Sequence, residues 1–359
     1  MGGKLITWLQ IHVVERLLLK RSFERIYMVM GGHIFFQTLS AAITMDLFSL
    51  LNDHQSMTRQ QIAQSLHCDE QPIRILLLGC VTLGLLKKKG LFYSNTFLSK
   101  QLFIRSSPRN IIDVVRWQSA INYRAMPHFA ESIKQNKNLG LDEFPGTETT
   151  LYERLAHDKA LEKIFQDAME SISRQANEML ANALDTSHWK HLVDVGGGNG
   201  TNIITLARRS PHLRASVFDS PSVCEIAKAT IAQAGLSDRL GTFSGNCFQD
   251  PFPKEADAIL FAHFFTIWSE ARNRALLRKC YESLPSGGSV IIFNMMQRDS
   301  EDGPFSAAMG SPYFLTLATG EGMLYTWGEY VRWMKESGFD QVTTQVLPRD
   351  HGLIIGRKH

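Results

Sequence analysis

The sequence predicts an α/β protein in which a mainly helical N-terminal part precedes a parallel β-sheet. From His191 to the C-terminus, short apolar runs that suit strands alternate with spans of helical periodicity, as in a sheet with crossover helices. The first 190 residues instead show mainly helical periodicity. A glycine-rich run directly follows the first strand, and such runs bind nucleotide-like ligands at the ends of parallel strands.

Composition excludes several classes of protein. The 359 residues include 38 Lys+Arg and 35 Asp+Glu, so the formal net charge of +3 gives no reason to expect a nucleic-acid partner. With 44% hydrophobic and 20% charged residues, the chain has the composition of a globular protein of two or three domains. The five cysteines form no CxxC pair, which argues against a zinc knuckle or a disulfide scaffold and fits a cytoplasmic protein.

Two apolar segments near the N-terminus resemble membrane signals. Residues 5–14 resemble the core of a signal peptide, but the charged residues Glu15 and Arg16 follow and no small-residue cleavage site is present. Residues 26–45 lack Asp, Glu, Lys and Arg, yet they contain the polar residues His33 and Gln37. We therefore expect neither secretion nor a membrane span, and we expect residues 26–45 to form a buried interface helix.

The rest of the N-terminal part resembles a winged helix. Thr58 and Gln61 form a capping-box pattern that opens a helix over residues 58–67, and a second helix is expected over 71–86. Two short strands follow around Gly90, within residues 86–97. Winged helices bind DNA or serve as dimerisation surfaces, and the basic run at residues 87–89 is compatible with either role.

We expect three regions along the chain. Residues 1–110 form a helical and winged-helix domain, 111–185 a helical region that contributes to the substrate pocket, and 186–359 the sheet domain. A loop is expected at 136–150. The expected strands of the last region are residues 192–195, 215–218, 239–243, 256–262 and 289–294, followed by a closing hairpin at 341–347 and 352–356.

The glycine-rich run after the first strand predicts a Rossmann-like ligand site. Gly196, Gly198 and Gly200 follow Asp194 directly before a helix, whose free N–H groups and positive dipole end face a ligand. Their spacing is GxGxG and differs from the GxGxxG of dinucleotide sites, which disfavours a pyrophosphate. Asp219 ends the second strand, where a carboxylate accepts hydrogen bonds from both ribose hydroxyls.

These motifs resemble those of the class I S-adenosylmethionine-dependent methyltransferases, in particular the bacterial relatives of plant small-molecule O-methyltransferases and of hydroxyindole O-methyltransferases. The run LVDVGGGNG at 192–200 resembles the first motif of that family, FDSP at 218–221 its FDLP, and GNCF at 245–248 its GDMF. Trp268 matches the Trp that closes the fourth-strand motif, and FQDAM at 165–169 resembles the segment that lines the acceptor pocket. Residues 41–51 and the winged helix resemble the dimerisation module of the family.

The resemblance implies a Rossmann-like methyltransferase domain with an N-terminal all-α/winged-helix dimerisation domain, S-adenosylmethionine as cofactor and a homodimer that binds a small molecule and no DNA. The glycines would lie beneath the amino-acid part of the cofactor, Asp219 would hold its ribose, and the GNCF segment would flank its adenine, with Asn in place of the Asp of the family. The implied cofactor-binding residues are Asp194, Gly196, Gly198, Gly200, Asp219, Ser220, Asn246, Cys247, Phe248, His263 and Trp268.

The chain departs from the family where the general base is expected. The usual His-Asp pair before Trp268 is replaced by Thr266 and Ile267, and the acid of the acceptor pocket is replaced by Leu324. Threonine does not accept a proton near neutral pH. His263 is the nearest titratable side chain, so the catalytic candidates are His263 and Thr266, and no metal cluster is expected. The expected substrate-binding residues are Phe165, Met169, Phe264 and Tyr313.

The expected function is methyl transfer to a small aromatic or polyketide-like secondary metabolite, with proximity supplying most of the rate. O-methylation is favoured because the resembled family consists of O-methyltransferases. C- or N-methylation of an electron-rich acceptor is the nearest alternative, because neither requires the missing base. Two further alternatives are a repurposed fold that uses the cofactor without methyl transfer and a winged-helix regulator, which would bind duplex DNA in a salt-dependent way.

Overall fold

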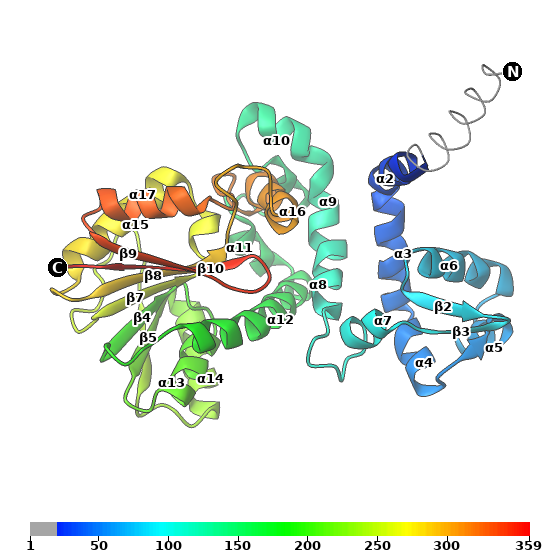
Figure 1. Cartoon of the computed structure of the whole chain (residues 1–359), viewed down its shortest axis with the longest axis horizontal. Helices are drawn as coiled ribbons and strands as arrows, with labels where there is room; N and C mark the ends of the chain where they lie inside the picture. Colours follow the sequence, from blue (N-terminus) through cyan, green and yellow to red (C-terminus); the bar gives the residue numbers. More distant parts are fainter. Residues whose placement is uncertain (1–19) are drawn as a thin grey trace, which may run out of the picture. The chain divides into compact units, whose positions relative to one another are not determined.

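The computed structural model describes residues 20–359 and divides them into two units, of which the first ends at Ser119 and the second spans Ala120–His359 (Figure 1). The apolar segment that resembles the core of a signal peptide, residues 5–14, lies outside the described residues. Each unit has its own core. The helices of the expected middle region beyond residue 120 belong to the same unit as the sheet.

The first unit contains the expected winged helix. A three-stranded sheet of order β1-β3-β2 packs with short helices, and β2 and β3 form the hairpin around Gly90. The capping box is present, since the Thr58 side chain accepts from the Gln61 N–H and the Gln61 side chain accepts from the Thr58 N–H. The elements are α2 (Lys20–Met30), α3 (Gly32–Thr44), α4 (Leu47–Asp53), β1 (Met57–Thr58), α5 (Arg59–Ser65), α6 (Glu70–Thr82), β2 (Leu86–Lys89), β3 (Phe92–Asn95), α7 (Phe97–Leu102) and α8 (Ile112–Trp117).

The single helix expected over residues 26–45 is wrong, because the chain breaks at Gly31 between α2 and α3. The axes of the two helical pieces differ by 63°. Two successive glycines, Gly31 and Gly32, weaken the helix at this point, and glycine is a common cause of such kinks. Within residues 20–359 no single helix is long and apolar enough to cross a membrane. The bent pair α2 and α3 together has the length and the apolar composition of a membrane span.

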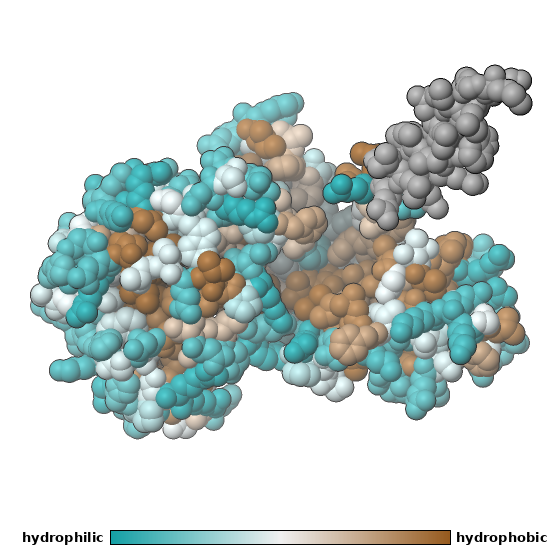
Figure 2. Space-filling model, in the orientation of Figure 1, coloured by the Kyte–Doolittle hydropathy of each residue, from teal (hydrophilic) through white to brown (hydrophobic). Residues whose placement is uncertain are grey.

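The expected burial of this segment at an interface stays a prediction, and within the single chain much of the segment is exposed. Large apolar side chains of α2 and the start of α3 are exposed, with 80% of Val29 and 59% of Ile34 accessible. Figure 2 shows apolar surface over the α3 and α7 region of the first unit. The exposed apolar side chains of α2 and α3 are Phe23, Ile26, Tyr27, Met28, Val29, Met30 and Ile34, which we name the α2–α3 apolar face.

The second unit begins with helices and continues as alternating strands and helices. Its helical first part consists of α9 (Tyr123–Ala125), η3 (Met126–His128), α10 (Phe129–Gln135), η4 (Leu139–Glu143), α11 (Leu151–Arg154), η5 (Leu155–His157) and α12 (Lys159–Ala183). The sheet part consists of β4 (His191–Val195), α13 (Thr201–Arg209), β5 (Arg214–Asp219), α14 (Pro221–Gln233), β6 (Leu240–Ser244), β7 (Ala258–Ala262), η6 (Phe265–Ile267), α15 (Glu270–Ser283), β8 (Ser289–Met295), α16 (Phe305–Tyr313), η7 (Phe314–Ala318), α17 (Trp327–Glu336), β9 (Gln341–Val346) and β10 (His351–Arg357).

The seven strands form one sheet in the order β6-β5-β4-β7-β8-β10-β9. The first five are parallel, and β10 is antiparallel to both β8 and β9, which confirms the closing hairpin. The order reverses at β4, since β5 lies on one side of it and β7 on the other. Ligands of open α/β sheets bind at such a switch point, beyond the carboxyl ends of the strands.

Helices cover both faces of the sheet and form two apolar cores (Figure 1). One core combines α12, α13 and α14 with Leu192 and Val217, and the other combines α15 and α17 with Val193 and Ile259. Leu192 and Val193 are neighbours in β4, and their side chains belong to the cores on opposite faces of the sheet, because side chains alternate along a strand. Because both faces are covered, the central strands β7 and β8 are mainly apolar and buried, and the carboxyl ends of the parallel strands are where a ligand would bind.

Candidate cofactor and acceptor sites

The glycine loop joins the end of β4 to the start of α13. Gly196, Gly198 and Gly200 have φ angles of +70°, +57° and +82°, which side chains with a Cβ rarely adopt. A Cβ placed on Gly198 would meet no atom within 4 Å, so there is open space beside the loop. A Cβ on Gly196 would instead overlap the ring of Phe264. Phe264, expected in the acceptor pocket, therefore packs against the glycine loop.

Asp219 joins the end of β5 to this loop. Its Oδ2 accepts a hydrogen bond from Gly198 N at 3.1 Å, and its Oδ1 accepts from Ser220 N at 2.7 Å. Burial raises the pKa of Asp219, and the two N–H groups oppose that shift. Both oxygens retain a lone pair, as a ribose ligand requires. Ser220 is exposed and begins α14 as its N-cap.

Asp194 is fully buried at the end of β4, directly below the glycine loop. Its Oδ2 accepts from the Asn202 side chain at 3.0 Å, whereas its Oδ1 has no hydrogen-bond partner. Burial raises its pKa to about 7, and the nearby Asp219 carboxylate adds to the increase. A buried carboxyl group with a free oxygen beside a second acid is suited to a cationic ligand group.

The segment after β6 forms an aromatic group with the segment after β7. The Phe248 ring packs edge-on against Trp268 at 4.9 Å, and the Arg272 guanidinium lies 5.0 Å from each of these rings. The Trp268 Nε1 is buried without a hydrogen-bond partner. Asn246 is exposed, and its Oδ1 accepts from Phe248 N.

Cys247 lies between Asn246 and Phe248, and its side chain is partly buried. Burial raises the pKa of its thiol to about 12, so the side chain stays neutral. Its carbonyl accepts from Lys279 Nζ at 2.6 Å. Sequence analysis missed Arg272 and Lys279, because nothing in the local sequence places α15 beside this loop.

His263 lies at the end of β7 with its ring against the sheet. Its φ of +54° is unusual for a non-glycine residue, and its backbone N–H donates to Phe293 O at 2.8 Å. The ring lies 5.2 Å from that of Phe293 and 5.1 Å from that of His351. Its Nε2 is buried and has no partner. Burial lowers the pKa of His263 to about 3, with a smaller contribution from His351, so the imidazole is neutral at physiological pH.

Thr266 lies in η6, between β7 and Trp268. It is only 5% exposed, and its neighbour Ile267 supplies no acid or base. The backbone of η6 is fixed on one side by Thr319, whose hydroxyl donates to Ile267 O. On the other side Asn273 Nδ2 donates to Phe265 O at 2.8 Å. Leu324, predicted to replace the acid of the acceptor pocket, is buried at 1% exposure.

Two of the expected acceptor-pocket residues are connected through a third that sequence analysis missed. Phe165 packs edge-on against Tyr152, with the ring centroids 5.8 Å apart, and the Tyr152 hydroxyl is hydrogen-bonded to that of Tyr313. Tyr313 is buried, and Met169 is partly buried one turn beyond Phe165 on α12. The sequence contains no motif around Tyr152 that would identify it, because its partners come from distant segments.

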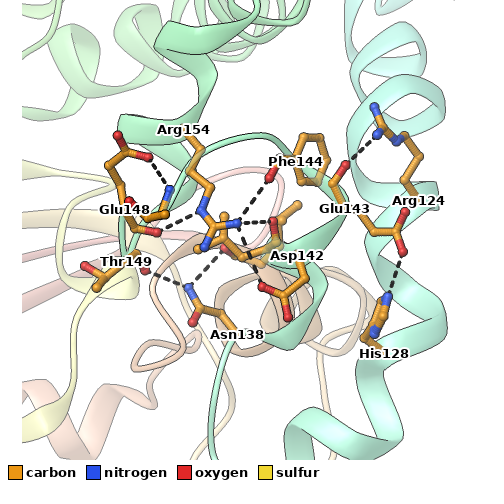
Figure 3. Close-up of polar contacts among 12 residues, drawn as sticks. Arg124, His128, Asn138, Asp142, Glu143, Phe144, Glu148, Thr149 and Arg154 are labelled. Carbon is orange, nitrogen blue, oxygen red and sulfur yellow. Dashed lines mark hydrogen bonds and ion pairs between the residues drawn. The ribbon is translucent and has the colours of Figure 1, made fainter.

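Arg154 fixes the helix that contains Tyr152 (Figure 3). Its Nε donates to Glu148 O at 2.8 Å, and its Nη1 donates to Leu141 O and Phe144 O at 2.9 and 3.1 Å. Only 11% of its side chain is exposed. A guanidinium that donates to three carbonyls holds this segment against α11. The segment expected as a loop at 136–150 is not irregular throughout, because it contains the short helix η4.

The residues around the glycine loop fit S-adenosylmethionine. The open space at Gly198 and the free lone pairs of Asp219 suit the nucleoside part, and the unpartnered Asp194 Oδ1 suits the ammonium of the amino-acid part. The Phe248 and Trp268 rings supply an aromatic surface of the kind that adenine requires. Among the described residues there is no group of three or more His, Cys, Asp or Glu side chains that would hold a metal ion.

The doubly covered sheet, the glycine loop at its switch point and the acid after the next strand define an S-adenosylmethionine-dependent methyltransferase. The chain belongs to the O-methyltransferase family. Residues 127–340 match the O-methyltransferase domain and residues 27–105 match the O-methyltransferase dimerisation domain. The winged-helix unit therefore contains a dimerisation domain of this family.

Comparison with curated proteins gives relatives that match over nearly the whole chain. The chain is 36% identical over 339 residues to L-tyrosine C(3)-methyltransferase of Streptomyces lavendulae, with 93% of each chain covered. It is 31% identical over 324 residues to 3-hydroxy-5-methyl-1-naphthoate 3-O-methyltransferase of Streptomyces sahachiroi, with 90% of this chain and 91% of that one covered. By their names, the first of these relatives methylates a carbon and the second an oxygen.

Solved structures give the same fold. The S-adenosylmethionine-dependent methyltransferase SibL in its apo form superposes with a TM-score of 0.83 at 34% identity, over 93% of this chain and 98% of that one. Human N-acetylserotonin methyltransferase in complex with SAM superposes with a TM-score of 0.81 over 94% and 97%. At 22% identity the human enzyme supports the fold alone.

Removal of the Asp219 carboxylate tests its assignment to the ribose. We expect Asp219→Ala to weaken S-adenosylmethionine binding by about 10- to 100-fold, because two charge-assisted hydrogen bonds are lost. Isothermal titration calorimetry measures the affinity, and circular dichroism checks that the variant is folded. Asp238→Ala, which alters an exposed acid before β6, at the opposite end of that strand from the site, serves as a control. Equal affinity in Asp219→Ala and the unmodified protein would contradict the assignment.

The buried Asp194 predicts that cofactor binding releases a proton. Its pKa is raised to about 7, so near neutral pH part of the population is protonated before binding. A cationic ligand group lowers that pKa, and the proton leaves to the buffer. Calorimetry in buffers of different ionisation enthalpy measures the release, which we expect to be a fraction of one proton at pH 7 and to vanish well above it. Asp194→Asn is expected to abolish the release, and an unchanged release in that variant would contradict the role of Asp194.

Proposed function

We propose that this methyltransferase transfers the methyl group to a small hydroxylated aromatic compound without a general base in the protein. The main observation is Thr266, which lies buried where the family has its base, next to the apolar Ile267. His263 does not replace that base, because burial lowers its pKa to about 3 and a group of such weak basicity removes few protons near neutral pH. We therefore assign His263 to the structure of the site.

Positioning is the main contribution of the protein under this proposal. S-adenosylmethionine supplies a methyl group on a sulfonium, which a nucleophile attacks in line with the departing sulfur. The glycine loop, Asp219 and Asp194 hold this donor at the ends of β4 and β5, and Phe165, Met169 and Tyr313 line the space for the acceptor. Holding two reactants in line is worth several orders of magnitude in rate, so an acceptor that is already nucleophilic needs no base.

The ring carbon beside the hydroxyl is the methylated atom that these residues favour. Attack by carbon forms the new C–C bond first, and the ring proton then leaves to water and restores aromaticity. Attack by a neutral hydroxyl oxygen instead requires removal of its proton, for which no base is present near Thr266. The similarity to an L-tyrosine C(3)-methyltransferase supports the carbon. The hydroxyl oxygen is the second candidate, supported by the match to the O-methyltransferase domain and to a 3-O-methyltransferase.

Transfer of label from the cofactor tests this proposal. The purified protein is incubated with methyl-labelled S-adenosylmethionine and a panel of phenols, including L-tyrosine and a hydroxynaphthoate, with L-phenylalanine as the control that lacks the hydroxyl. We expect label in a phenolic product, and fragmentation by mass spectrometry distinguishes carbon from oxygen. Binding of the cofactor without label in any product would contradict methyl transfer and favour a repurposed fold.

We also propose a homodimer formed through the first unit. The α2–α3 apolar face exposes seven large apolar side chains on a segment of 12 residues, far more than isolated surface residues explain. The segment lies largely within the matched dimerisation domain at residues 27–105. Packing of this face against a second copy would remove it from water.

A charge on this face is expected to separate the subunits. We expect the unmodified protein to sediment at twice the mass of one chain and Val29→Asp to weaken the dimer by at least about tenfold, because an unpaired carboxylate would be buried. Val346→Asp is the matched control, since Val346 is also 80% exposed but lies on β9. A monomeric unmodified protein, or equal weakening by both variants, would contradict the proposed interface.

A further inference from the structure

Arg272 is a charged residue between the proposed cofactor side and the segment after η7. It lies in the first turn of α15, and its guanidinium is 5.0 Å from the ring of Phe248 and 5.0 Å from that of Trp268. In the opposite direction, its Nε lies 3.0 Å from Oε2 of Glu321, which follows η7. One side chain therefore connects the rings assigned to adenine with a segment from the other side of the site.

The guanidinium holds the two aromatic rings as one group. Phe248 follows β6 and Trp268 follows η6, and the two rings meet edge-on at 4.9 Å. A guanidinium within about 6 Å of an aromatic ring is attracted to the face of that ring. Because Arg272 makes this contact with both rings, it opposes their separation. The aromatic surface that the site offers to adenine therefore depends in part on Arg272.

Glu321 is the acid that holds Arg272 in this place. Its Oε2 accepts a hydrogen bond from the Ser269 hydroxyl at 3.1 Å, beside the ion pair with Arg272. Glu270, the other acid at the start of α15, pairs instead with Arg274 at 3.2 Å. Among the residues that the structure describes, Glu321 is the one acid in an ion pair with Arg272.

Glu321 belongs to residues 319–322, which pack directly on η6. The Thr319 hydroxyl donates to a backbone carbonyl of η6. A Cβ on Gly322 would overlap Thr266 O, so the two backbones are in close contact. The position of Glu321 is therefore linked to that of Thr266, the residue that stands where a base was expected.

The same segment contacts the proposed acceptor side. A Cβ on Gly320 would lie 2.9 Å from Asn138 N, so these backbones also touch. Asn138 Nδ2 donates to Thr149 O at 2.9 Å, two residues before α11 (Figure 3). α11 contains Tyr152, whose ring packs against Phe165. This segment therefore lies between η6 and the residues that lead to the proposed acceptor pocket.

We propose that Arg272 is a positioning residue that makes the order of residues 319–322 depend on the bound cofactor. Water beside the exposed guanidinium is displaced when adenine covers the Phe248 and Trp268 rings, and an ion pair is stronger where water is excluded. The pair with Glu321 then holds this segment more firmly against η6. The inference rests on the proposed function, and under it the site binds the cofactor before the aromatic acceptor.

The exposure of this ion pair suits it to local control and not to support of the whole fold. The exposed fraction of the side chain is 46% for Arg272 and 33% for Glu321. Pairs of this kind contribute little to overall stability, so we expect their variants to fold. The amides of Gly320 and Glu321 donate hydrogen bonds at 2.9 and 3.3 Å, and their exchange with solvent therefore reports opening of this segment.

Hydrogen exchange measures the dependence without any acceptor. The full-length protein is labelled in deuterated buffer with and without saturating S-adenosylhomocysteine, the product of methyl transfer, and exchange is followed by mass spectrometry. We expect the ligand to slow exchange in residues 319–322 by about threefold or more in the unmodified protein. Arg272→Met and Glu321→Gln are each expected to lose most of this slowing at saturation, and Arg272→Lys, which keeps the cation, to retain more of it than Arg272→Met.

Affinity for S-adenosylhomocysteine separates the two contacts of Arg272. We expect Arg272→Met to weaken binding by about three- to tenfold in calorimetry, because the cation beside both rings is lost. Glu321→Gln is expected to weaken it by about threefold at most, since coupling between the segment and the ligand is reciprocal. Arg278→Met alters an exposed arginine of the same helix and is the matched control, expected to match the unmodified protein in both measurements.

Two results would overturn the proposal: exchange in residues 319–322 that the ligand does not slow in the unmodified protein, or slowing of equal size in Arg272→Met and Glu321→Gln. A protein that shows slowing dependent on Arg272 but labels no phenol would keep this positioning role and lose the proposed function. A protein that labels phenols without such slowing would keep the function and lose this role.

Discussion

The hydrogen bond from Gly198 N to Asp219 Oδ2 joins the two strand ends on which the proposed cofactor site depends. It holds the glycine loop after β4 against the acid after β5, at the point where the strand order reverses. The loop adopts this path only because its glycines tolerate positive φ angles. The same bond places Asp219 near Asp194, so the loop geometry also sets the electrostatics of the site.

Two acids, the buried Asp194 and the partly buried Asp219, lower the stability of the folded protein when no cation is bound. Asp194 has an oxygen without a hydrogen bond, and burial disfavours the charged forms of both Asp194 and Asp219. Such groups lower the free energy of unfolding, and a cation that binds beside them restores it. A sulfonium cofactor with an ammonium group has the charge that this arrangement requires. Affinity for the cofactor and the loss of stability in its absence therefore have the same origin, the burial of these two carboxyl groups.

The parts of the structure that could be predicted from the sequence are those that depend on local pattern. Strand periodicity, the Thr58 capping box and the glycine loop with Asp219 depend on residues close together in the chain, and the structure contains each of them. The break at Gly31 had a local signal, two adjacent glycines, that the apolar run obscured. The Tyr152 to Tyr313 bond, the carbonyls around Arg154 and the packing of Phe264 on Gly196 had none, because each joins segments that only the tertiary fold brings together.

The two halves of the site place opposite electrostatic demands on the protein, and the fold keeps them on different elements. The cofactor side uses acids at the ends of β4 and β5, which favour positive charge. The proposed acceptor side, on α11, α12 and α16, uses aromatic rings and the hydroxyls of Tyr152 and Tyr313, which burial keeps neutral near pH 7. Under the proposed function this side positions an aromatic acceptor, and the acids of the other side favour the cationic methyl donor, so that different elements meet the two demands.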